Sequence, residues 1–67
     1  MSVWRVYPAG TVPASVPGER AARRLARKYV RLNVRCDLYE EDEAGEPRLR
    51  VRMEADGTEA LDSEEAR

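Results

Sequence analysis

Half of the positive charge of the chain lies in one short segment, which makes that segment the best candidate for chemistry. The stretch ERAARRLARKYVR, residues 19–31, carries six cations and one acid, whereas the 67-residue chain has 12 Lys and Arg, 13 Asp and Glu and a net charge of −1. Guanidinium groups bind carboxylates and phosphates through charge-assisted, often paired hydrogen bonds. The candidate partner-binding residues are therefore Arg20, Arg23, Arg24, Arg27, Lys28 and Arg31.

The spacing of these cations is unfavourable for a helix that only faces water, because solvated faces usually mix charges of both signs. Four pairs of like charge are spaced i,i+4: Arg20–Arg24, Arg23–Arg27, Arg24–Lys28 and Arg27–Arg31. At about 0.2–0.5 kcal/mol each, they cost roughly 1–2 kcal/mol. The acids of 37–46 and of the chain from residue 54 onward could offset this cost, within the molecule or between copies. An external anion is the alternative, and the near-zero net charge favours the acids of the protein itself.

A second candidate surface combines cations with an aromatic ring on the predicted outer face of the sheet. Its members are Arg35, Tyr39, Arg48, Arg50 and Arg52. Basic residues interleaved with aromatic ones are typical of surfaces that bind single-stranded nucleic acid. Asp37 and Glu54 interrupt the patch, which favours an ordinary solvated sheet face.

Enzymatic chemistry has little support in the sequence. There is no histidine, and the single cysteine, Cys36, falls at an inward position of a predicted strand, where a thiol is inert. The acid-rich segment from Asp37 does not fit a calcium loop, because its sixth and twelfth positions hold Asp42 and Arg48 instead of Gly and Glu. We predict no catalytic residue, no metal site, no cofactor and no small-molecule substrate.

The basic segment is predicted to lie on an amphipathic helix over 17–28. The four residues Ala22, Leu25, Ala26 and Tyr29 fall within an arc of roughly 100°, and the cations lie opposite them within roughly 140°. The apolar side is expected to pack on a sheet and the basic side to face solvent. In an alternative, the helix continues to Leu32 with Asn33 as its C-terminal cap.

Alternation of apolar and polar residues predicts three strands, over 2–7, 30–40 and 47–55. The segment 8–18 holds three prolines and two glycines and is expected to be an irregular connection. Either Trp4 and Val6, or Val3 and Tyr7, join the core. In the predicted hairpin, Leu38 lies opposite Leu49, so that Asp37 faces Arg50, Arg31 faces Asp56 and Arg35 faces Arg52.

The predicted fold is therefore α+β: a small two-layer β-α-β-β domain over 1–56, with a three-stranded sheet and one amphipathic helix on one face. The acidic residues 57–67 are expected to form a disordered tail. The first strand could pair with the second strand in a right-handed βαβ crossover, or with the third strand as a split βαβ unit.

The predicted function is that of a small non-enzymatic interaction module, a regulator, adaptor or inhibitor-like protein. It would act through the basic helix face as a homo-oligomer. The alternative is a nucleic-acid-binding accessory protein that uses the basic helix or the Arg-rich outer sheet face. The N-terminal MSVWRVYPAG does not resemble a signal peptide, and no run of about 18 apolar residues is present, so we expect a cytoplasmic protein that does not bind membranes.

Overall fold

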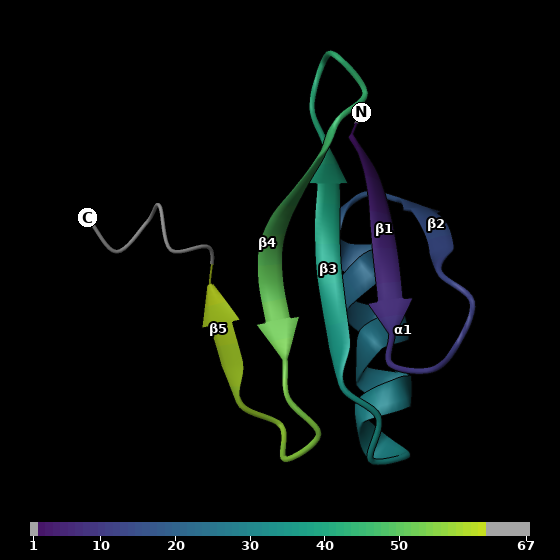
Figure 1. The fold of residues 1–67 in the computed structure, drawn as a ribbon, viewed down its shortest axis with the longest axis vertical. Helices are drawn as coiled ribbons and strands as arrows, with labels where there is room; N and C mark the ends of the chain where they lie inside the picture. The colour runs from purple at the N-terminus through teal and green to yellow at the C-terminus, as the bar shows by residue number, and fades with distance from the viewer. Residues whose placement is uncertain (1, 62–67) are drawn as a thin grey trace.

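A computed structural model describes residues 2–61, which form one helix packed on one face of a five-stranded antiparallel sheet (Figure 1). The elements are β1 (Val3–Pro8), β2 (Ala14–Pro17), α1 (Glu19–Arg31), β3 (Cys36–Glu41), β4 (Pro47–Met53) and β5 (Glu59–Leu61). The strand order is β2-β1-β3-β4-β5. The prediction of a small α+β fold is confirmed, but the prediction of three strands is wrong.

The two strands that were not predicted are the outer strands of the sheet. Strand β2 lies in the segment expected to be irregular and pairs with β1, with Trp4 opposite Val16 and Val6 opposite Ala14. This hairpin reverses the chain before the helix, so that β3 runs antiparallel to β1 beside it. Neither a right-handed βαβ crossover nor a split βαβ unit forms.

Strand β5 occupies part of the segment predicted to be a disordered tail. Residues 59–61 pair with β4 after a tight turn, in which Gly57 has a positive φ of 95°. The carboxylate of Asp56 closes this turn by accepting hydrogen bonds from the backbone N–H and the hydroxyl of Thr58. Residues 62–67 of the predicted tail lie outside the described residues.

Helix α1 begins two residues later and ends three residues later than the predicted span of 17–28. At its C-terminus Asn33 adopts the left-handed conformation with φ 66°, and the N–H of Val34 donates to the carbonyl of Tyr29 at 2.9 Å. This pattern is a Schellman motif, which satisfies the last carbonyls of a helix. The alternative, a helix that continues to Leu32 and is terminated by Asn33, is therefore close to the structure, in which α1 ends at Arg31 and Leu32 is the C-cap residue. The strand predicted from residue 30 begins only at Cys36.

The register between β3 and β4 differs from the predicted one by two residues from Cys36 to Leu38 and by one residue from Tyr39 to Glu41. Leu38 lies opposite Val51, and Tyr39 lies opposite Leu49, so that Arg50 is an extra residue in a β-bulge. As a result Asp37 faces Arg52, instead of Arg50, and the two side chains form an ion pair at 3.1 Å. The predicted pairings of Arg35 with Arg52 and of Arg31 with Asp56 do not occur either, since Arg31 lies in the helix.

The core lies between the helix and the sheet, and it contains the Trp4 and Val6 pair rather than Val3 and Tyr7. Its buried members are Trp4, Val6, Ala22, Ala26, Cys36, Leu38, Val51 and Met53. Helix α1 contacts β1 and β3 and, to a smaller extent, β2 (Figure 1). Within residues 2–61, α1 is too short and too polar to cross a membrane.

Candidate anion-binding surface

Packing on the sheet turns the cations of α1 towards solvent. Ala22 and Ala26 are fully buried, and Leu25, Tyr29 and Val30 pack against the same core. Because these residues fix the rotation of the helix about its axis, the opposite side must point away from the sheet. Small alanines at the closest contact let the helix lie near the strands, and they contribute no polar group to the core.

Five exposed cations on this outer side surround one shallow hollow of about 350 Å³. They are Arg20, Arg24, Arg27, Lys28 and Arg31, and we call this set the basic face. Within residues 2–61, no carboxylate forms an ion pair with any of the five. The basic face therefore offers many hydrogen-bond donors and no acceptor from its own side chains.

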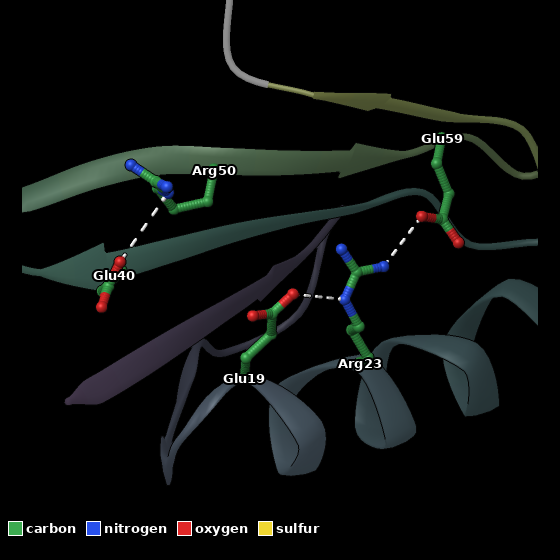
Figure 2. Close-up of polar contacts among 5 residues, drawn as sticks. All are labelled: Glu19, Arg23, Glu40, Arg50 and Glu59. Carbon is green, nitrogen blue, oxygen red and sulfur yellow. Dashed lines mark hydrogen bonds and ion pairs between the residues drawn. The ribbon is translucent and has the colours of Figure 1, made fainter. Parts of the chain in front are cut away.

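Arg23, the sixth predicted site residue, belongs to a different environment (Figure 2). Its Nε donates to Glu19 at 2.8 Å, and its Nη1 donates to Glu59 on β5 at 2.8 Å. Hydrogen bonds to these two carboxylates raise the pKa of the guanidinium above its ordinary value. Arg23 thus links the helix to the sheet and is already neutralised, so it is not part of the basic face.

Four of the acids that were expected to screen the helix within the molecule are engaged elsewhere. Three of them pair with arginines of the sheet: Asp37 with Arg52, Glu41 with Arg5, and Glu40 with Arg50 at 3.7 Å. Asp42 accepts hydrogen bonds from the backbone N–H groups of Ala44 and Glu46, and so closes the β3–β4 turn. Internal screening by described acids is therefore confined to Arg23.

Sequence reasoning identified the basic face but missed the two acids that neutralise Arg23. Glu19 precedes Arg23 by four residues, and this spacing favours an ion pair on a helix, so the signal was present. Glu59 carried no such signal, because its approach depends on β5, which was not predicted.

The second candidate surface is divided by the β-bulge. Arg35, Tyr39 and Arg52 remain associated with the outer face, where Asp37 lies 3.9 Å from Arg35 as well as 3.1 Å from Arg52. Arg48 lies opposite Glu40, which in turn lies opposite the buried Trp4, so the register places Arg48 on the helix side.

The aromatic ring of this second surface is also partly engaged. Tyr39 packs edge-to-face on Tyr7, with 5.0 Å between the ring centroids. Because Asp37 lies between Arg35 and Arg52, the remaining residues of this face do not form a continuous basic and aromatic surface.

Cys36 is buried, and its thiol points to the carbonyl of Ala26 at 3.8 Å. Burial, together with the nearby charge of Asp37, raises the pKa of this thiol. A thiol in this position is a poor nucleophile. Within residues 2–61, no group of three or more Cys, Asp or Glu side chains is arranged to hold a metal ion.

Comparison with known proteins finds no match to a family model, a curated protein or a solved structure. Function must therefore be inferred from the geometry and charge of the chain. The feature with the clearest chemical meaning is the basic face, since it concentrates five cations around one hollow.

Proposed function

We propose that this protein is a small non-catalytic interaction module that binds a partner of high negative charge density through its basic face. The observation that supports this proposal is the separation of the six helix cations into two groups. Arg23 is neutralised inside the molecule, whereas the five residues around the hollow have no acid partner among residues 2–61. A bound anion would supply the negative charges that residues 2–61 do not place beside these five cations.

The energetics of the helix agree with this role. Three like-charge i,i+4 pairs remain within the basic face: Arg20–Arg24, Arg24–Lys28 and Arg27–Arg31. Together they oppose folding by about 1 kcal/mol, a considerable amount for a domain of this size. A partner that neutralises the face removes this repulsion, and binding and helix stability then support each other.

A second copy of the chain is one possible source of negative charge. Glu41, Asp42 and Glu43 surround a hollow of about 310 Å³ near Ser2 and Val3, at the end of the sheet where β3 turns into β4. Contact between this acidic end and the basic face of another copy would produce the homo-oligomer that the sequence suggests. It is the homotypic form of the same proposal.

The proposal can be tested on immobilised heparin, a polyanion without sequence or shape information. Replacing Arg24, Arg27 and Lys28 together with Gln should lower the salt concentration at which the protein elutes. The matched control replaces Arg35, Arg48 and Arg52 with Gln, which removes the same charge away from the basic face and should leave elution close to wild type. Equal losses in both triple variants would show that only net charge matters, and would overturn the proposal.

A further inference from the structure

We infer that the partner of the basic face is the phosphate backbone of double-stranded DNA, bound without recognition of base sequence. This inference rests on the proposed function and names its anion. Four of the five residues on the face are arginines, whose planar guanidinium groups match phosphate oxygens in pairs. Phosphate contacts of this kind supply most of the sequence-independent affinity of DNA-binding proteins.

The composition of the hollow argues against an acidic protein as the main partner. Protein interfaces place aromatic and apolar anchors at their centre, often together with arginine, whereas lysine is depleted there. All the residues around this hollow are cations. Among residues 2–60, the large exposed apolar side chains are Val3, Val12 and Leu32, and none of them lines the hollow. The hollow therefore has no aromatic or apolar anchor for a protein surface.

The absence of an aromatic side chain in the hollow argues against single-stranded nucleic acid. Proteins that bind single strands combine cations with aromatic rings, on which the unpaired bases stack. Tyr29, the aromatic residue of α1, packs against the core, and the Tyr7–Tyr39 pair involves strands of the sheet. A duplex, whose bases are already stacked, requires no such ring.

The shape of the face suits a B-form duplex. The basic residues project from the outer side of a helix, within an arc of roughly 100°, and Arg20 and Arg31 are about 16 Å apart along the axis. The major groove of B-DNA, about 12 Å wide, admits a helix, whereas that of A-form RNA is too narrow for side chains to read. Helix α1 lies with its opposite side on the sheet (Figure 1). Its five cations therefore point away from the sheet, where the two walls of a groove could flank the helix.

The same side chains are poorly suited to reading sequence. Direct recognition of bases needs side chains held in fixed orientations, whether arginine for guanine or Asn and Gln for adenine. The basic face has neither amide, and within residues 2–61 no hydrogen bond orients any of its five cations. We therefore expect binding that depends strongly on salt and weakly on base sequence.

The test measures fluorescence anisotropy of a labelled DNA duplex of about 20 base pairs, two helical turns, between roughly 50 and 200 mM salt. The full chain should bind two duplexes of unrelated sequence equally. The logarithm of the binding constant should fall with the logarithm of salt concentration with a slope of about −4, as expected when four or five phosphates are neutralised. The Arg24, Arg27, Lys28 triple variant should reduce this slope by about 2.7. The Arg35, Arg48, Arg52 triple variant should retain it.

Competition with other polyanions separates failure of this inference from failure of the proposed function. Unlabelled duplex DNA should compete better than single-stranded DNA, duplex RNA or poly-glutamate. Tighter binding of poly-glutamate, of single-stranded DNA or of duplex RNA would overturn the assignment to DNA duplexes, while the polyanion-binding function would stand. Strong preference for one of the two duplex sequences would overturn sequence independence. If the protein binds none of these polyanions, heparin included, both the assignment to DNA and the proposed polyanion-binding function are overturned.

Discussion

Arg23 and Arg24 are neighbours in the sequence, yet the fold gives them different roles. The guanidinium of Arg23 joins Glu19 and Glu59, while Arg24 faces the hollow. Since the side chain of Arg23 is only 24% exposed, the loss of both ion pairs in Arg23→Gln should lower the free energy of unfolding by roughly 0.5–1 kcal/mol. Urea denaturation measures this change. DNA binding should remain near that of wild type, and a large loss of binding would place Arg23 in the site after all.

Cys36 gives a prediction for alkaline pH. Because burial raises the pKa of its thiol above the ordinary value of about 8.5, folding favours the protonated form. Its contribution to stability is fully present below that pH and is lost as pH rises through the higher pKa of the folded state. Cys36→Ala should therefore show a smaller loss of stability between pH 8 and pH 10 than wild type, as measured by urea denaturation.

A thiol reagent provides the independent check on Cys36. The native protein should react much more slowly than the urea-unfolded chain at the same pH, because the thiolate is both rare and inaccessible. Equal rates would show that the thiol is exposed and that its raised pKa has been assigned to the wrong cause.

Asn33 is the residue that fixes the end of the helix, because it holds the left-handed conformation of the Schellman motif. Glycine adopts this conformation without strain, whereas a residue with a Cβ and no compensating polar group pays roughly 1–2 kcal/mol. We expect Asn33→Gly to match or exceed the stability of wild type and Asn33→Ala to fall below it by about 1 kcal/mol. Thermal unfolding of the pair compares them directly. The reverse order would mean that the Asn33 side chain itself is needed.

At the scale of the elements, a substitution that removes positive charge from the basic face of α1 should raise the stability of the free protein and weaken binding. Arg24→Glu converts repulsion with Arg20 and Lys28 into attraction, so the free energy of unfolding should rise by about 1 kcal/mol. The same change should weaken DNA binding strongly. Urea denaturation of this variant measures its stability, and fluorescence anisotropy measures its DNA binding. If the variant were less stable than wild type and bound DNA equally well, the assignment of the basic face would be contradicted.

The helix and its buried side could be predicted because a period near 3.6 extends over about two turns, from Ala22 to Tyr29. The C-terminal end could not be fixed in the same way. Val30, Leu32 and Val34 alternate as in a strand, but Val30 packs on the core from the helix. The signal that ended the helix was Asn33, whose tolerance of positive φ outweighs a short alternating pattern.

The unpredicted parts of the sheet have separate physical causes. Strands β2 and β5 contain four and three residues, too few for a period of two to be distinguished from chance. The bulge at Arg50 leaves no sign in the sequence pattern, because apolar residues alternate without interruption from Leu49 to Met53. Only the pairing with β3 shows that Leu49 lies opposite Tyr39, and this pairing is a long-range property. The position of Arg48 on the helix side of the sheet could not be predicted for the same reason.

For the whole molecule, charge rather than apolar surface is expected to control association between copies. The basic face and the acidic β3–β4 end lie on different elements, so one copy can meet another head to tail. We expect the mass measured by light scattering to rise at low ionic strength and to return to that of a monomer when salt shortens the range of the interaction. Oligomers that persist in high salt would point instead to an apolar interface.

The outer strands of the sheet carry a consequence for aggregation. Fibrils grow when a long, flat outer strand pairs with a neighbouring chain. Here β2 has four residues and ends in Pro17, which lacks an N–H to donate, and β5 has three residues. Neither offers a segment of the six or seven residues that a stable fibril spine requires. We expect the protein, incubated at high concentration, to cause no increase in the fluorescence of an amyloid dye. Replacing Pro13 and Pro17 with Val should make it far more prone to form fibrils, and the dye fluorescence should then rise.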